Sequence, residues 1–351
     1  MNARLPRHRT GDADLDQRIV ELLDAAGATD DRDQLFEILA SAVLLAQDHA
    51  DRLDLKITNA ALKEMRAAFK MFMPFHGRPK VTIFGSARTT SDDPLYQQTR
   101  AAAHALADKG WMVVTGAGPG IMEAGVEGAG IDSAIGVNIR LPFEQEASEF
   151  IAGDRLVSMK YFFTRKLMLM KESAGFIVLP GGFGTLDEAF ELFTLVQTGK
   201  SEPKPIVLLE VSGGTYWRTW EAFMRNEVAA RGLVSPHDLE LYRITDDANE
   251  AARLLRQFYR NYDSVRWVGD RLVVRLKSSP TDDELADLNS RYGEIVVSGA
   301  IERAGALPAE VADDDKVDLP RLVMRFERRH FALLHDLIWD LDQLKSAPPL
   351  D

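Results

Sequence analysis

The sequence of 351 residues contains no cysteine, so disulfide bonds and thiolate metal sites are excluded. It also has no run of about 18 uncharged apolar residues, which a membrane-spanning helix requires. No apolar segment follows the basic residues of the first ten positions, as one would in a signal peptide. These absences predict a cytoplasmic protein that makes no membrane contact.

Basic residues are fewer than acidic ones. The chain has 42 lysine and arginine residues against 54 aspartate and glutamate residues, which gives a net charge of -12. Proteins that bind nucleic acids usually show a basic face, so we expect no nucleic-acid partner. A small anionic ligand remains compatible with this charge, because main-chain amides and a few basic side chains can hold a phosphate locally.

Hydrophobic patterning divides the chain into three predicted domains, which span residues 1–79, 80–262 and 263–351. In the first, apolar residues recur at three- and four-residue spacing, which predicts a helical region packed on the main domain or on a second subunit. The last predicts a small α+β domain with the element order βαββα. No cluster of ligand-type residues stands out there, so a role in assembly or packing is favoured over effector binding.

In the middle region, short apolar runs alternate with amphipathic segments. Strands buried on both faces and each followed by a helix predict an α/β fold with a doubly wound, Rossmann-like parallel sheet. Such a sheet binds ligands at the carboxyl ends of its strands, and the glycine-rich segments of this chain fall at those ends. The predicted strands are Val81–Phe84, Met112–Thr115, Ile135–Asn138, Phe176–Leu179 and Ile206–Leu209.

Two of the glycine-rich segments follow the first two predicted strands. The first, Gly85–Arg88, offers close backbone approach, a hydroxyl and a positive charge, although a Gly-Ser turn is also common at strand ends. The second, Gly116–Ala124, opens a helix but fails the dinucleotide fingerprint, because Ile121 occupies the position of its third glycine. Nicotinamide chemistry is therefore disfavoured. Glu123 fits either a plain first-turn acid or a group that contacts substrate.

The third segment, Pro180-Gly-Gly-Phe-Gly-Thr-Leu-Asp-Glu188, leads from a predicted strand into a helix. Three glycines in four positions let consecutive amides face one anion, and Thr185 adds a hydroxyl. The G-K-[ST] ending of a Walker A loop is missing, so magnesium-dependent NTP hydrolysis is not implied. Thr185 and Glu188 also have the spacing of a capping box, and spacing alone leaves both interpretations open.

A fourth element is the predicted helix Phe162–Glu172, which carries Arg165 and Lys166. Adjacent helical residues point in different directions, so at most one of the two basic groups faces the site squarely. A rigid guanidinium suits a ribose–phosphate ligand, which favours Arg165.

Together these residues resemble the LOG family of nucleoside 5′-monophosphate phosphoribohydrolases, whose members were often labelled lysine decarboxylases. The family pattern P-G-G-x-G-T-x-x-E is matched by Pro180–Glu188, and its preceding Arg-Lys pair by Arg165 and Lys166. The likeness covers roughly residues 80–258. Phe162 stands where the small family members carry Met. Glu123 stands where those members often carry Gly, and it resembles the longer bacterial branch, which includes AMP-type nucleosidases.

The resemblance implies hydrolysis of the base–ribose bond of a nucleoside 5′-monophosphate, either an AMP-like nucleotide or a cytokinin riboside monophosphate. It implies no metal or organic cofactor, and a homodimer or higher homo-oligomer. No lysine has a convincing pyridoxal-phosphate context, so decarboxylation lacks a mechanism. The implied catalytic residues are Glu188, Arg165 and Glu123; the phosphate-binding residues are Gly181, Gly182, Gly184 and Thr185; the substrate-binding residues are Gly85, Ser86, Gly118, Gly120 and Lys166.

The alternative function is a non-catalytic carrier or sensor of the same fold that binds a nucleotide or the molybdenum cofactor. Arg165 with Glu188 favours the enzyme, because a pure phosphate holder has little need for a carboxylate near an anion.

Overall fold

The computed structural model of the protein describes residues 6–140 and 150–350. Contacts within the chain divide it into two compact units, Met1–Arg66 and Ala67–Asp351. Within the described residues, no helix has the length and apolar character needed to cross a membrane.

The N-terminal unit is helical. Its helices are α1 (Ala13–Ala25), α2 (Arg32–Gln47) and the first part of α3 (Arg52–Phe72), which continues into the second unit. The side chain of Asp12 caps α1 by accepting hydrogen bonds from the amides of Asp14 and Leu15. Apolar residues at helical spacing form its small core, which contains Ile19, Leu23, Phe36 and Ala40.

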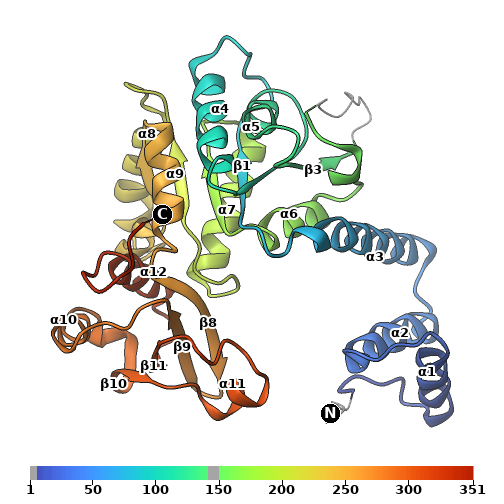
Figure 1. The fold of residues 1–351 in the computed structure, drawn as a ribbon. Helices are drawn as coiled ribbons and strands as arrows, with labels where there is room; N and C mark the ends of the chain where they lie inside the picture. The colour runs from blue at the N-terminus through green and yellow to red at the C-terminus, as the bar shows by residue number, and fades with distance from the viewer. Residues whose placement is uncertain (1–5, 141–149, 351) are drawn as a thin grey trace. The chain divides into compact units, whose positions relative to one another are not determined.

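The second unit is built on a seven-stranded, entirely parallel sheet with the order β4-β3-β2-β1-β5-β6-β7. This confirms the predicted doubly wound architecture. Figure 1 labels two strands of this sheet, β1 and β3. The strands are β1 (Lys80–Phe84), β2 (Met112–Thr115), β3 (Ala134–Ile139), β4 (Leu156–Met159), β5 (Gly175–Val178), β6 (Ile206–Leu209) and β7 (Arg243–Thr245).

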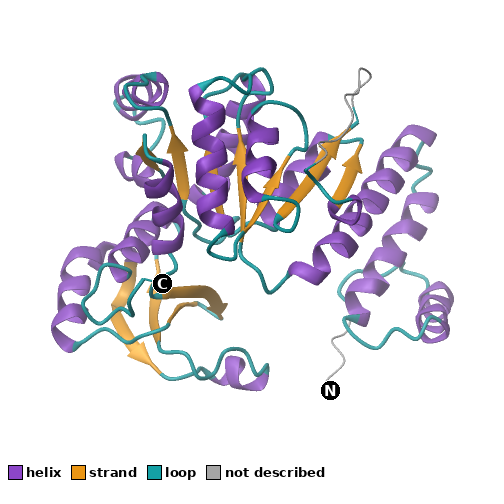
Figure 2. Cartoon of the chain, turned by 45° about the horizontal axis from the view of Figure 1, so that its top comes forward, coloured by secondary structure: helices purple, strands orange, loops and turns teal. Residues whose placement is uncertain are grey.

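Helices cover both faces of this sheet (Figure 2). Alternate residues of one strand point to opposite faces, so Ile83 joins the core beneath α4, α5 and α9, whereas the Thr82 hydroxyl donates to the carbonyl of Leu169 in α6, at 3.0 Å. Both residues are fully buried, as expected for a central parallel strand. The helices are α4 (Pro94–Ala107), α5 (Ile121–Ala129), α6 (Phe162–Lys171), α7 (Phe183–Gln197), α8 (Tyr216–Phe223) and α9 (Ala248–Gln257).

The C-terminal part forms a four-stranded antiparallel sheet with the order β10-β11-β9-β8. Its elements are β8 (Tyr262–Val268), β9 (Arg271–Leu276), α10 (Asp282–Tyr292), β10 (Val296–Ala304), α11 (Pro308–Ala312), β11 (Arg321–Phe326) and α12 (Phe331–Leu341). The prediction of βαββα was therefore incomplete, because it lacked β8 and α11. β8 is a half-buried edge strand whose polar residues hide its pattern, and α11 spans only 5 residues.

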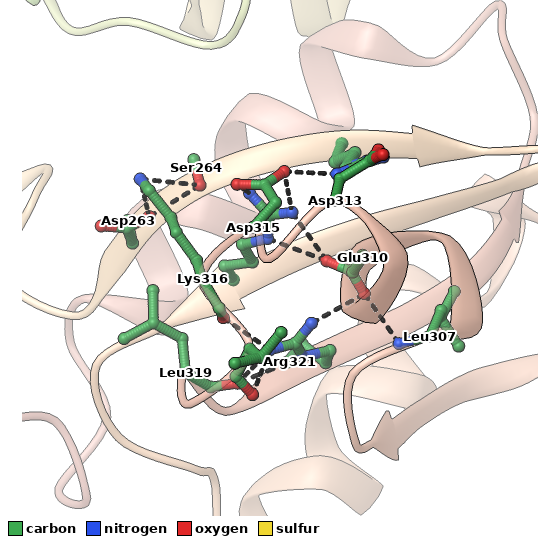
Figure 3. A network of polar contacts seen from close by, with 12 residues as sticks. Asp263, Ser264, Leu307, Glu310, Asp313, Asp315, Lys316, Leu319 and Arg321 are labelled. Atoms are coloured by element: carbon green, nitrogen blue, oxygen red, sulfur yellow. Dashed lines mark hydrogen bonds and ion pairs between the residues drawn. The ribbon is translucent and has the colours of Figure 1, made fainter. Parts of the chain in front are cut away.

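A buried ion network holds the segment around α11 against this sheet (Figure 3). Glu310 is fully buried. Its Oε1 atom pairs with Nη2 of Arg275 and its Oε2 atom with Nη1 of Arg321, each at 2.7 Å. Asp315 accepts a second bond from Arg275, also at 2.7 Å. A buried carboxylate is tolerable here because two guanidinium groups compensate its charge.

α12 joins the antiparallel sheet to the parallel one. The ring of His335 is buried, with its Nε2 atom 3.0 Å from the carbonyl oxygen of Lys204, just ahead of β6. The Asp342 carboxylate, after the end of α12, accepts hydrogen bonds from the amides of Asn261 and Tyr262, where β8 begins.

Candidate active site

The candidate active site lies where the order of the parallel strands switches direction. From β1 the chain moves outward through β2, β3 and β4, and then returns to place β5 on the other side of β1. The segments that follow β1 and β5 therefore diverge at the carboxyl edge of the sheet, which is the usual ligand position in such folds. They are Gly85–Arg88 and Pro180–Gly184.

A cavity of about 830 Å³ opens between these two segments and α6. This volume falls within the usual range of small-molecule sites, which is roughly 300–1,000 Å³. Nine of the residues predicted from the sequence line it: Gly85, Ser86, Arg165, Lys166, Gly181, Gly182, Gly184, Thr185 and Glu188.

Arg165 projects from the first turns of α6 and is held rigidly. Only 7% of its surface is exposed, and its Nε donates to the carbonyl of Val137 in β3 at 2.9 Å. Its Nη1 lies 3.5 Å from Oε1 of Glu188. A Cβ atom at Gly116 would lie 1.9 Å from its Nη2, so glycine is needed there to make room for the guanidinium.

Glu188 lies in the second turn of α7 and shares the cavity with Arg165. Burial raises the pKa of Glu188 to about 7, although the positive charges of Arg165 and Lys166 act in the opposite direction. The neighbouring carboxylates of Asp187 and Glu191 add to the rise. A carboxyl group with a pKa near neutrality can exchange a proton under physiological conditions, as a general acid or base must.

The turn before α7 presents main-chain amides to the cavity. α7 begins at Phe183, with Gly182 as its N-cap and no side-chain capping bond. The first amides of a helix have no preceding turn to donate to, so those of Phe183, Gly184 and Thr185 can serve an anion. The capping-box interpretation of Thr185 and Glu188 is wrong, because the helix starts two residues earlier and Glu188 turns to Arg165 instead.

Two contacts fix the shape of this turn. A Cβ atom at Gly181 would lie 2.3 Å from the Thr185 hydroxyl, so only glycine lets the helix start so close. The Tyr216 hydroxyl, from the start of α8, donates to the carbonyl of Gly181 at 2.7 Å. Sequence reasoning missed Tyr216, which carries no motif and follows the turn by 35 residues.

Lys166 also lines the cavity, but its charge is already engaged. Its ammonium group lies 2.6 Å from a carboxylate oxygen of Asp187 and 2.8 Å from one of Glu191, both in α7. These ion pairs clamp α6 to α7. The structure thus places Arg165 and Lys166 in the different directions that helical geometry predicts.

Three predicted residues do not reach the cavity. Gly118, Gly120 and Glu123 are not among the described residues that line the cavity. From α5, Met122 lines it instead. Gly120 has a φ of +70°, and a Cβ atom there would lie 2.5 Å from the Ser86 carbonyl oxygen, which also accepts from the amide of Ile121. Gly120 therefore lets the second glycine segment pack against the first.

Other side chains at the cavity were not among the predicted site residues. Phe183, the variable position of the motif, is 95% exposed, and Phe162 is 55% exposed. Arg88 and Ile139, the latter at the end of β3, also line the cavity. The apolar side chain of Ile139 does not by itself indicate a binding site, and only its position at the end of a strand could have predicted it. Within residues 6–140 and 150–350, no group of three or more His, Asp or Glu side chains is arranged to hold a metal ion.

Known proteins match the part of the chain that carries most of this site. A family model described as "Possible lysine decarboxylase" matches residues 116–255, which include the Arg165 helix and the glycine-rich turn. The cytokinin riboside 5′-monophosphate phosphoribohydrolase of Mycobacterium tuberculosis is 30% identical over 177 residues, which are 49% of this chain and 91% of that enzyme. The chain belongs to the LOG family. This confirms the family resemblance predicted from the sequence.

Other relatives of this LOG-family chain match over shorter regions. The cytokinin riboside 5′-monophosphate phosphoribohydrolase LOG1 of Arabidopsis thaliana is 33% identical over 117 residues, 33% of this chain and 53% of the plant enzyme. Among solved structures, the molybdenum cofactor carrier protein of Chlamydomonas reinhardtii is 20% identical with a TM-score of 0.37, over 51% of this chain and 97% of that one.

Proposed function

We propose that this LOG-family protein hydrolyses the N-glycosidic bond of a nucleoside 5′-monophosphate, giving a free base and ribose 5-phosphate. The observation that carries the proposal is the buried pair of Arg165 and Glu188, 3.5 Å apart, beside a turn of free amides. The match to phosphoribohydrolases supports it, since their printed names describe this reaction class.

The chemistry follows from where charge develops. As the bond between C1′ and the base nitrogen breaks, the ribose ring acquires positive charge, which a nearby carboxylate stabilises. In the proposal, Glu188 supplies that carboxylate and orients the water whose oxygen adds to C1′. One proton of this water finally resides on the departing base, so atoms and charge balance.

The remaining groups position the substrate. The amides of the turn, with the Thr185 hydroxyl, hold the phosphate, and Arg165 orients the sugar. Gly85 and Ser86 are proposed to approach the substrate from the other side of the cavity. Glu123 is proposed to act only indirectly, because it does not line the cavity. The substrate is proposed to be AMP-like or a cytokinin riboside monophosphate, whose base would meet the exposed rings of Phe162 and Phe183.

We further propose that the protein forms homodimers. Exposed apolar side chains occur on α6 and at the start of α7, where Phe162 and Phe183 line the cavity, and exposed apolar patches often mark interaction surfaces. Phe162, Phe163, Leu167 and Phe183 are each about half exposed or more.

A direct test incubates the protein with AMP, CMP, GMP and isopentenyl-AMP and separates released bases by chromatography. Glu188→Gln keeps the shape of the side chain but removes its charge, and we expect kcat to fall by about 10²–10⁴-fold. Glu191→Gln, one turn further along α7, is the matched control and should lose far less. Unchanged base release by Glu188→Gln would contradict this mechanism. If the wild type releases a base from none of these nucleotides, a non-catalytic carrier would be favoured.

A further inference from the structure

A second large cavity lies at the opposite edge of the parallel sheet. It encloses about 710 Å³, and Lys80, Trp111, Ala174 and Lys204 line it at the amino ends of β1, β2, β5 and β6. The start of the antiparallel sheet, at Asp263, forms part of its wall. We call this cavity the basic cleft. Neither the LOG motif nor the proposed reaction involves it.

The charge of the basic cleft is opposite to that of the whole chain. Nine lysine and arginine side chains line it against three carboxylates, an excess of six positive charges in a chain whose net charge is -12. Two of the carboxylates pair with cleft lysines: Glu172 with Lys171 and Asp263 with Lys316, each at 2.6 Å. Most of the positive charge therefore has no carboxylate partner among the described residues.

Several of these cations are fixed in place by main-chain carbonyls. Lys80 is 4% exposed and donates to the carbonyls of Phe75 and Arg78, at 2.7 and 3.1 Å. Lys204 donates to the carbonyl of Met170 at 3.0 Å, and Arg260 donates to the carbonyl of Pro348 at 2.6 Å. Carbonyl oxygens orient a cation without neutralising it, so the cleft is preorganised and remains positive.

The electrostatic cost of this arrangement is visible at Lys204. Burial lowers its pKa to about 8, although Glu202 and Glu172 oppose the shift. Burial likewise lowers the pKa of Lys80, and nearby Lys171 and Arg78 add to that effect. A bound anion would stabilise the charged form of both lysines.

We propose that the basic cleft binds a small anion that carries several phosphate groups. The excess of six charges exceeds what one phosphate monoester needs, and about 710 Å³ accommodates a ligand of nucleotide size. Lysine ammonium groups and arginine forks are the usual partners of phosphate oxygens. A long polyanion such as a nucleic acid would meet the negative charge of the remaining surface, which favours a small ligand.

The ligand is either a bare polyphosphate chain or a nucleoside polyphosphate. Trp111 and Tyr259 lie in the wall of the cleft with ring centroids 6.3 Å apart, but Trp111 is only 6% exposed, so the choice between the two ligands is left to titration.

Isothermal titration of the full-length protein with inorganic tripolyphosphate tests the proposal, with ATP as a parallel probe. The double variant Lys109→Gln/Arg256→Gln removes two cleft cations for which no hydrogen bond of the charged group is seen among the described residues. The matched variant Arg88→Gln/Lys166→Gln removes two cations from the other cavity. Thermal melting checks that both proteins are folded.

We expect tripolyphosphate to bind the wild type with one main site, and binding to weaken about tenfold or more in the cleft variant but less than about twofold in the matched variant. Tighter binding of ATP would assign a nucleoside polyphosphate, and tighter binding of tripolyphosphate a bare chain. Absence of binding, equal weakening in both variants, or weakening only in the matched variant would overturn the proposal. Because the readout is binding, none of these results depends on the proposed hydrolysis.

Discussion

At the scale of single residues, the site depends on a glycine that lies outside its most recognisable motif. Gly116 follows β2 and contributes no functional group, yet the guanidinium of Arg165 occupies the space that any side chain there would fill. The position of the most buried cation of the site is therefore determined by two segments about fifty residues apart in the sequence.

We predict that Gly116→Ala lowers kcat/KM for nucleotide hydrolysis by about 10²-fold, because the new methyl group would lie 1.9 Å from Nη2 and must displace Arg165. Steady-state kinetics with AMP measures this. Gly305→Ala, where an added Cβ meets nothing within 4 Å, is the control. Equal kinetics in the two variants would show that Arg165 need not be held so closely.

Lys166 affects the reaction through the charge of its neighbour. Burial raises the pKa of Glu188 to about 7, and the ammonium group of Lys166 is one of the positive charges that limit this rise. If the ionised Glu188 is the active form, activity rises with pH through this pKa. We predict that Lys166→Gln moves this limb of the pH–kcat profile to higher pH. The reason is that the ionised form of Glu188 loses the stabilising positive charge of the Lys166 ammonium group, so the pKa of Glu188 rises.

The matched control for this prediction is Lys200→Gln, an exposed residue after α7 that does not line the cavity. The phosphate of the substrate titrates identically with every variant, so the difference between profiles reports on the protein. A shift to lower pH, or none, would contradict the assignment of Glu188 as the group that ionises.

At the scale of elements, the segment around α11 is stabilised by charge more than by apolar contact. Its 5-residue helix is too short to be stable alone, and the fully buried carboxylate of Glu310 connects it to β9 through Arg275 and to β11 through Arg321. We predict that Glu310→Gln lowers the free energy of unfolding by about 3 kcal/mol or more, because the buried guanidinium groups of Arg275 and Arg321 lose the carboxylate charge that they share, and only Arg275 keeps a second carboxylate, that of Asp315.

Urea unfolding measures this change, and Asp313→Asn provides the control within the same network. Asp313 pairs with Arg266 but is 47% exposed, so its loss should change the free energy of unfolding by less than about 1 kcal/mol. A similar loss of unfolding free energy in both variants would contradict the prediction, because the buried carboxylate would then contribute no more than the exposed one.

The sequence predicted elements well where one pattern dominated. The five central strands and the helix after the glycine turn were found because their residues are buried on both faces or at helical spacing. β8 was missed because Asp263, Ser264 and Arg266 interrupt its apolar residues, and their partners lie about fifty residues away. Long-range pairing of this kind has no local signal.

The candidate site was likewise predictable where it depends on local sequence and not where it depends on long-range packing. Glycines and a threonine in a fixed order predicted the turn, because main-chain geometry depends on local sequence. The contact between Arg165 and Glu188 and the contribution of Tyr216 depend on how α6, α7 and α8 pack, which residue spacing does not contain. The placement of Glu123 outside the cavity depends on packing in the same way.

At the scale of the whole molecule, the proposed dimer makes a prediction for hydrodynamics. Leu167 is 47% exposed on α6, next to the cavity but not among the residues that line it. We predict that the wild type sediments as a dimer and that Leu167→Glu shifts it toward a monomer, because a charge in an apolar interface is costly to desolvate. Leu53→Glu, at a residue of α3 that is 63% exposed, is the control, and a wild-type monomer would contradict the proposal.

α6 has a consequence for which changes of length the chain can accept. Its 10 residues carry Arg165 toward the candidate active site and end at Lys171, in the basic cleft. One inserted residue between them would rotate the two ends against each other by about 100° and shift them by about 1.5 Å. Relatives that keep both sites should therefore vary the composition of this helix freely at exposed positions, yet show no insertion or deletion between Arg165 and Lys171.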